Sequence, residues 1–348
     1  MAKKEEQPSM LQQLRADLKN KQLGRVYIFH GEETFLMQHY LEQVKKLLLD
    51  ELTESFNFHK LTAETFQLQS FLDSVENLPM MAENTLVWVD EVDLFKLPEG
   101  DRERIAQAFE DIPDYCTVIF SYVTTPWKPD KRLTKLWKAI DDNSCIVEFA
   151  LQEQRDLIPW VTRHFAAAKK RISPDLCAYL IEISGGTMTA LSSEIQKIVA
   201  FSGAEAITRA DIDAVTEPVL DAVVFQMTAQ LAQRDYGGAL VKLRQLMKMQ
   251  EEPLKILGGL GMHFRQISAA RTVLDAGGTT ADLMRICGMR DFAARKAMES
   301  ARRFSPAFCA KAAELVMETD RSIKTSRDDP QRLLELLILR LAQEARGD

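Results

Sequence analysis

The sequence is poor in cysteine, and its cysteines are not paired. None of the five belongs to a CxxC motif or lies beside a histidine, and each is inside or next to an apolar run. This pattern excludes a disulfide framework and a structural zinc site, because both need cysteines at defined spacings. It predicts buried, reduced thiols. The five residues are Cys116, Cys145, Cys177, Cys287 and Cys309.

The sequence also lacks any apolar run near the ~20 residues that cross a bilayer. Its first residues, MAKKEEQPSM, carry two lysines but no following apolar segment of about 7 to 15 residues, so they do not form a secretory signal. At 46% hydrophobic and 27% charged, the chain of 348 residues has an ordinary globular composition. We therefore expect a cytoplasmic protein without a membrane partner, built from two or three domains.

Motifs of catalysis and metal binding are missing as well. The five histidines show no HxxxH spacing, and no Ser-His-Asp set or pair of carboxylates stands out. The sequence therefore predicts no catalytic residues, no metal and no cofactor. The histidines are His30, His39, His59, His164 and His263.

A concentrated basic patch is also absent. Residues 217–348 hold 20 Lys and Arg against 17 Asp and Glu, whereas residues 1–216 hold 24 against 34, for a net charge of -7. A free-standing DNA-binding module needs a stronger positive footprint. We expect any DNA contact to be shared with partner proteins.

What the sequence does contain is a regular alternation of short apolar runs and helical patterns over residues 1–150. The runs are rich in Val, Ile, Phe, Trp and Thr, which predicts a parallel sheet covered by helices on both faces. The helical patterns are 35–52, 64–78, 101–109 and 131–140, and the first places Leu36, Tyr40, Val44 and Leu48 on one face. The runs are 26–29, 56–61, 85–89, 116–120 and 145–149.

Strand signals stop after residue 150. Residues 151–216 predict a small helical domain, with Ser173 or Asp211 as capping residues. Residues 217–348 predict a larger helical domain, broken by glycine pairs of which Gly258-Gly259 falls inside a helical pattern and suggests close packing. Its last helix has Asp329 and Pro330 at its start, and its apolar residues cover most of its circumference, so it should be buried in its own domain or against another subunit.

The loop after the first run has the position of a phosphate-binding loop but not its residues. A P-loop reads GxxxxGK[ST]; from Gly31, Leu36 replaces the second glycine, Met37 the lysine and Gln38 the hydroxyl residue. Glu32 and Glu33 also place carboxylates at the helix N-terminus, where a phosphate would sit. We expect no ATP binding here.

The third run ends in Asp90-Glu91, the pattern of a Walker B segment, in which the Asp holds magnesium and the Glu activates water. Without a phosphate cradle we interpret the pair as solvated carboxylates at a strand end. The alternative is an active AAA+ ATPase in DNA metabolism with a non-standard P-loop that uses Asp90 and Glu91.

Five stretches give the chain a family resemblance that runs through nearly its whole length. They are VYIFHGEETFL (26–36), LPMMAENTLVWV (78–89), KRLTKLWK (131–138), GTMTALSSEIQK (186–197) and DRSIKT (320–325). In this order they resemble the delta subunit family of the bacterial DNA polymerase III clamp loader.

That resemblance implies an α/β AAA+-like domain with a degenerate P-loop (1–150), a helical lid (151–216) and a helical collar for oligomerisation (217–348). It implies a mechanical role: binding and helping to open the beta sliding clamp, while DnaX-type gamma/tau subunits hydrolyse ATP and delta-prime completes the complex on primed DNA. Nothing in the sequence resembles a nucleotidyl transfer site, so any polymerase activity would belong to the holoenzyme.

The family's clamp-contacting element falls at Leu78, Pro79, Met80 and Met81, at the end of the helix before the third strand. Methionine is flexible and polarizable and suits an apolar pocket on a partner, and Pro79 would end the helix. The residues alone favour the alternative that Met80 or Met81 packs under the third strand. Family members often have an aromatic residue where this chain has Met81.

Two groups of basic residues remain. Lys128–Lys138 contains lysines and Arg132 near Trp127 and Trp137, which is a pattern of nucleic-acid binding, but helical register with Leu133 predicts burial of Trp137. Four further cations lie on one helical pattern. We interpret both groups as surface or subunit-interface charges in preference to DNA contacts. The four cations are Arg295, Lys296, Arg302 and Arg303.

Overall fold

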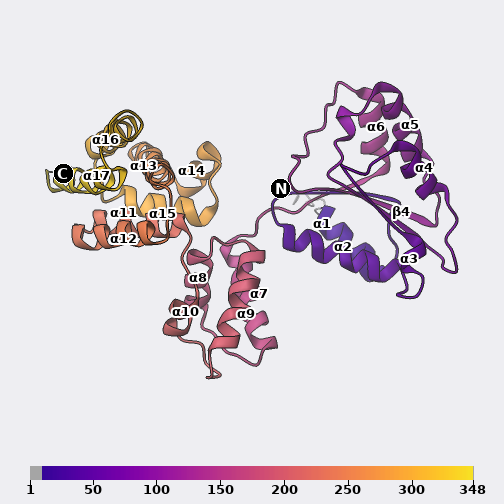
Figure 1. Ribbon diagram of the computed structural model, residues 1–348, viewed down its shortest axis with the longest axis horizontal. Helices are drawn as coiled ribbons and strands as arrows, with labels where there is room; N and C mark the ends of the chain where they lie inside the picture. The colour runs from indigo at the N-terminus through magenta and orange to yellow at the C-terminus, as the bar shows by residue number, and fades with distance from the viewer. Residues whose placement is uncertain (1–9, 348) are drawn as a thin grey trace, which may run out of the picture. The chain divides into compact units, whose positions relative to one another are not determined.

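The structure is a computed structural model that describes residues 10–347, with the side chains of residues 292, 346 and 347 left undescribed. The residues before Met10, on which the absence of a secretory signal was judged, lie outside this range. The chain forms two compact units that divide between Leu151 and Gln152, and each unit is described by itself (Figure 1).

The first unit is built on a five-stranded parallel sheet, as the alternating apolar runs predicted. Its strand order is β2-β3-β4-β1-β5, so the first strand lies between the last two. Each strand begins within two residues of its predicted run. The bounds are β1 Val26–His30, β2 Phe58–Thr62, β3 Thr85–Asp90, β4 Cys116–Tyr122 and β5 Cys145–Glu148.

Helices cover both faces of the sheet, and successive side chains of β1 point to the two layers. Tyr27 and Phe29 pack with the side of α1 and α2, whereas Val26 and Ile28 pack with the side of α4, α5 and α6 (Figure 1). The bounds are α1 Met10–Asn20, α2 Thr34–Leu48, α3 Glu54–Asn57, α4 Leu68–Glu76, the 3-10 helix Leu94–Lys96, α5 Glu99–Glu110 and α6 Thr134–Asn143.

Helix α1 was not predicted. It packs beside α2 and strand β5 and places Leu14 fully in the core. The signal was present, since Leu11, Leu14 and Leu18 have the three-and-four spacing of one helix face.

The second unit is entirely helical in its named elements. The first four helices lie in the predicted lid range: α7 Gln154–Ala167, α8 Pro174–Ile183, α9 Met188–Phe201 and α10 Arg209–Val215. Ser173 caps α8, as predicted, by accepting a hydrogen bond from the Leu176 amide. Asp211 is not the cap of α10: Thr208 is the N-cap, and Asp211 is the third helical residue that completes a capping box with it.

Seven helices follow, and one apolar core runs through them from Val223 to Ala345. The 216/217 boundary between lid and collar stays a prediction. The bounds are α11 Leu220–Ala232, α12 Tyr236–Lys248, α13 Pro253–Asp275, α14 Thr280–Cys287, α15 Asp291–Ala301, α16 Pro306–Thr325 and α17 Pro330–Gly347.

Gly259 lies within α13 at a close contact with α11, as its place in a helical pattern suggested. A Cβ atom there would come within 3.0 Å of Leu220 and 3.3 Å of Val224. Gly258 has open space around it, so only one glycine of the pair is needed for packing.

Helix α17 begins as predicted, with the Gln331 amide donating to the Asp329 carboxylate over 3.1 Å. Leu334, Leu337, Ile338 and Leu341 are buried, whereas Leu336 and Leu339 are about half exposed. The helix is therefore buried on one side only within its own unit.

The cysteine prediction was wrong at one position. Cys116, Cys177 and Cys309 are buried and Cys145 is partly buried, but Cys287 at the end of α14 is exposed. No helix of residues 10–347 has both the length and the apolar character needed to cross a membrane.

Candidate functional site

The loop between β1 and α2, where a P-loop would lie, is attached to the end of the neighbouring strand β5. The Phe149 amide donates to the His30 carbonyl over 2.7 Å, and the Glu33 amide donates to the Phe149 carbonyl over 2.9 Å. Gly31 has a φ of +125°, and a Cβ atom there would lie 2.4 Å from the Phe149 carbonyl oxygen. The Glu33 amide at the start of α2 is therefore already hydrogen-bonded to the protein backbone. Only glycine fits at position 31, because any side chain there would collide with the backbone at the end of β5.

The side chains of this loop leave no phosphate cradle. Glu33 is fully buried at the N-cap of α2, and Glu32 is exposed. Met37, at the lysine position of the motif, packs into the core with Phe149, and Leu36 packs partly against the same cluster. A cation at position 37 would point into apolar residues, so the sequence-based expectation of a closed site has a structural basis.

The Glu91 carboxylate accepts three backbone hydrogen bonds from the segment after β4. The amides of Val123, Thr124 and Thr125 donate to it over 2.7, 2.8 and 2.7 Å. Burial alone would raise the pKa of Glu91, but these amides hold its pKa below the usual value. Glu91 also has a left-handed backbone, with a φ of +62°.

Asp90 lies in a second chain of hydrogen bonds. Trp88 Nε1 donates to Ser121 Oγ over 2.7 Å, and the Ser121 hydroxyl donates to the Asp90 carboxylate over 2.6 Å. The Lys60 ammonium lies 3.6 Å from the other Asp90 oxygen and 3.7 Å from the centre of the Trp88 ring.

The interpretation of Asp90 and Glu91 as solvated carboxylates therefore needs correction. Both are partly buried and bound by protein groups, which connect the ends of β2, β3 and β4. Asp90 accepts one hydrogen bond and Glu91 three from protein donors, so both carboxylates have structural partners. Sequence alone could not show this, because the donors lie in a distant loop that only the fold brings to Glu91.

Residues Leu78 to Met81 form an exposed loop, not a helix end. Helix α4 ends at Glu76, two residues before the predicted end, and Leu78, Met80 and Met81 are 75%, 57% and 93% exposed. This contradicts the alternative in which either methionine packs under β3. Met81 has a φ of +54°, an uncommon conformation for a side-chain-bearing residue.

A buried side chain holds this loop. Asn57 is 1% exposed, and its amide nitrogen donates to the Met80 carbonyl over 2.9 Å while its oxygen accepts from the Met80 amide over 2.7 Å. The same nitrogen donates to the Thr53 carbonyl over 3.0 Å. Asn57 thus fixes both polar backbone groups of the residue before Met81.

Asn57 was placed inside a predicted strand, and its role was missed. The usable signal was its residue type, because asparagine is disfavoured in strands and favoured where a side chain bonds to a loop backbone. Next to it, Phe56 of α3 is 54% exposed, so a further apolar side chain neighbours the loop anchor.

Two of the five cations of residues 128–138 form ion pairs, and a third lies over an aromatic ring. Arg132 forms an ion pair with Asp130, Lys135 lies 3.3 Å from Glu103, and Lys131 lies over the Trp137 ring. Trp127 packs with Tyr122 and Trp137 is partly buried against the core. Both rings thus have contacts within the protein, which favours a structural role over stacking on bases.

Comparisons with known proteins cover most of the chain. Residues 27–150 match the family described as DNA polymerase III, delta subunit, and residues 221–341 match the DNA polymerase III delta subunit, C-terminal domain. DNA polymerase III subunit delta of Bacillus subtilis (strain 168) is 26% identical over 330 residues, which are 93% of this chain and 94% of that protein.

A solved structure shares the fold. The Bacillus subtilis DNA clamp loader delta protein (YqeN) matches with a TM-score of 0.64 and 23% identity, over 96% of this chain and 99% of that one. The predicted architecture, an α/β unit on a parallel sheet with additional helices, is thus confirmed.

Replacing Glu91 by Gln should lower the free energy of unfolding at pH 7 by about 1 to 2 kcal/mol, because the new NH2 group would face at least one of three amide donors. Because the folded-state pKa of Glu91 is lowered, the stabilisation is complete above the unfolded-state pKa and disappears as pH falls through the folded-state pKa. Urea titrations of both proteins between pH 7 and pH ~3 measure the difference. Glu64→Gln, an exposed control, should change nothing; equal stability of Glu91→Gln at pH 7 would contradict the structural role.

Proposed function

Because this chain belongs to the DNA polymerase III delta subunit family, we propose that it binds the beta sliding clamp and helps to open it for loading onto primed DNA. The observation that supports this most directly is the loop of residues 78–81. It presents three exposed apolar side chains on a backbone that Asn57 anchors to α3. Exposed apolar side chains in a held conformation are what a binding hot spot requires.

The role we propose is mechanical, and the chain contributes no ATP hydrolysis. In this proposal DnaX-type gamma/tau subunits supply the ATPase and delta-prime completes the ring, in the cytoplasm where the chromosome is copied. The loop of residues 31–33 supports this division of roles between subunits. The Glu33 amide and Gly31 both contact the Phe149 backbone at the end of β5, in place of a phosphate. A fold of the nucleotide-binding type whose P-loop position is taken up by contacts within the protein is suited to assembly beside subunits that bind ATP.

Replacing Met80 and Met81 by Ala should weaken binding of the beta sliding clamp by roughly 30-fold or more, the loss of ~2 kcal/mol expected for a hot spot. Surface plasmon resonance with the purified chain and its cognate clamp measures this. The double variant should fold normally, since both side chains are exposed.

The matched control is Met317→Ala, because Met317 is another well-exposed methionine, on α16 in the other unit. It should leave clamp affinity unchanged. Wild-type affinity of the Met80/Met81 variant would remove the clamp-contact assignment.

Replacing Asn57 by Ala should weaken clamp binding by about 5- to 20-fold even though Asn57 is buried and cannot touch the clamp, because the loop backbone loses two hydrogen bonds. Clamp affinity measured in the wild-type and the Met80/Met81 double-alanine backgrounds gives a double-mutant cycle. The effect of Asn57→Ala should disappear in the second background.

A control variant separates this effect on the loop from a general loss of protein stability. Ser184→Ala removes the hydroxyl of another buried polar residue, which donates to the Leu180 carbonyl at the end of α8, and should leave clamp affinity intact. An equal effect of Asn57→Ala in both backgrounds would show that Asn57 does not act through the methionines.

The competing function is an active AAA+ ATPase that uses Asp90 and Glu91. The structure favours the mechanical role, so the isolated chain should show no magnesium-dependent ATP binding. ATP should be tested up to about 100 μM, which is roughly 100 times the Kd of ~1 μM that a functional site would have. Isothermal titration calorimetry with ATP and magnesium tests this. Micromolar binding that is lost on Asp90→Ala would contradict the purely mechanical role and favour the ATPase alternative.

A further inference from the structure

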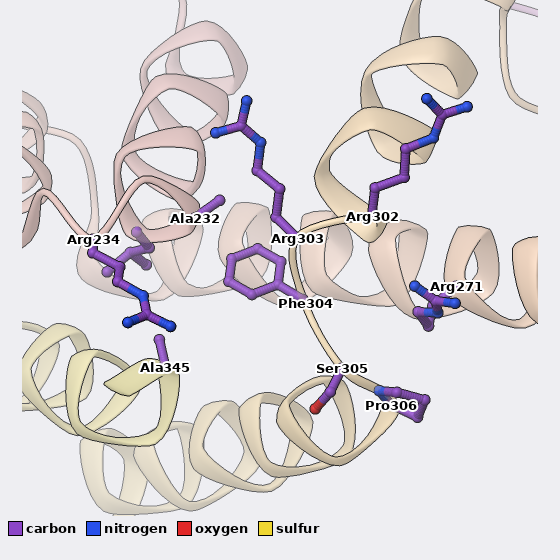
Figure 2. A pocket seen from close by; sticks show the side chains of 10 residues that line it. Ala232, Arg234, Arg271, Arg302, Arg303, Phe304, Ser305, Pro306 and Ala345 are labelled. Atoms are coloured by element: carbon purple, nitrogen blue, oxygen red, sulfur yellow. The ribbon is translucent and has the colours of Figure 1, made fainter. Parts of the chain in front are cut away.

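A hollow of about 350 Å³ opens in the second unit where four segments distant in the sequence meet. It lies between the end of α11, the later part of α13, the turn from α15 to α16 and the end of α17. Four of its ten described lining residues are arginines, and none of the ten is acidic. Figure 2 shows Arg234, Arg271, Arg302 and Arg303 around the ring of Phe304. We call this hollow the arginine pocket.

Three of these arginines carry uncompensated charge. Arg271 forms an ion pair with Asp275 and donates to the Ala301 carbonyl over 3.1 Å, so it supports the end of α15. Within residues 10–347, Arg234, Arg302 and Arg303 form no ion pair. By contrast, Arg295 on the preceding helix pairs with Asp291, and Lys296 lies over the Phe225 ring.

The backbone holds two sides of the pocket in place. Arg234 follows α11 with a φ of +63°, and the amides of Arg234 and Asp235 return to the carbonyls of Leu231 and Gln230 in a Schellman motif. Glycine is the usual residue at that position, whereas this chain has an arginine. On the other side, Ser305 accepts a hydrogen bond from the Phe308 amide and caps α16, whose positive N-terminal end adds to the field.

The residues that line the arginine pocket suit a phosphate group better than a nucleobase. A guanidinium group binds phosphate oxygens through two parallel hydrogen bonds and keeps its charge at any physiological pH. Phe304 is buried and stacks on Phe308 with ring centres 4.4 Å apart, so its face is already covered. A free nucleotide would need a surface for its base, which this lining does not offer. A phosphodiester backbone needs only the cations.

We infer that the arginine pocket binds the phosphodiester backbone of a DNA strand, without sequence preference, through Arg234, Arg302 and Arg303. The choice of DNA as the source of phosphate rests on the proposed function at primed DNA. The binding itself is independent of the clamp loop, since the pocket lies in the second unit and Met80 and Met81 lie in the first.

The test uses the full chain and a fluorescent DNA oligonucleotide, single-stranded or duplex, in anisotropy titrations between about 50 and 200 mM salt. Replacing Arg302 and Arg303 together by Ala should weaken binding about tenfold or more, and lower the slope of log affinity against log salt by ~0.7 to 0.9 for each phosphate that is no longer neutralised. Arg302→Lys with Arg303→Lys keeps the charge but not the paired hydrogen bonds, and should give an intermediate affinity.

Three comparisons make the result specific. Arg155→Ala with Arg163→Ala removes the same charge from exposed positions on α7 and should leave affinity near wild type. Inorganic phosphate and dAMP at millimolar concentration should not displace the oligonucleotide, whereas dAMP binding that depends on Arg302 and Arg303 would overturn the assignment to a strand. The Met80/Met81 double-alanine variant should bind DNA normally, so loss of clamp binding and loss of DNA binding are separable.

The inference is also overturned by two other results. One is the absence of oligonucleotide binding to the wild-type chain at about 50 mM salt. The other is unchanged DNA affinity of the Arg302/Arg303 variant; impaired assembly of the clamp-loader subunits in the same variant would assign the pocket to an acidic segment of a protein partner.

Discussion

The arrangement of the first unit depends on how the carboxyl ends of its parallel strands are bonded. In parallel sheets these ends form the edge where ligands bind, because loops leave backbone donors unpaired there. In this chain the donors have protein acceptors. The Glu33 amide bonds to Phe149, and the three amides after β4 bond to Glu91. Two of the loops at this edge are therefore bonded to groups of the protein itself.

The exposed loop of residues 78–81 precedes β3 and therefore lies at the other edge of the sheet, where Asn57 anchors it separately. Binding through Met80 and Met81 carries an entropic cost, since methionine has three rotatable bonds and a free loop would add backbone freedom. Asn57 removes the second part of that cost by holding both backbone groups of Met80. The methionine side chains keep their rotatable bonds, which lets them adapt to an apolar pocket while the backbone of Met80 stays anchored.

The sequence allowed the sheet, most helices and the closed P-loop to be predicted, because these follow from local periodicity and residue type. Apolar runs identified five strands, and the apolar residue at the lysine position of the P-loop motif is found in the core. The failures are of another kind. The partners of Glu91, the anchoring by Asn57 and the cap by Thr208 depend on which donors meet which acceptors in space. Exposure of Cys287 likewise depends on where α14 ends.

The arginine pocket shows the same limit for charge. In the sequence, Arg302 and Arg303 belong with Arg295 and Lys296 as one basic helical group. In the structure that group divides, because Arg295 and Lys296 have partners in their own unit. Arg302 and Arg303 instead line the same pocket as Arg234, which three helices separate from α15 along the chain. Pairing neutralises a cation locally, and an unpaired cation keeps its full attraction for an anion. The acidic net charge of the chain thus coexists with a local positive site that no count along the sequence could locate.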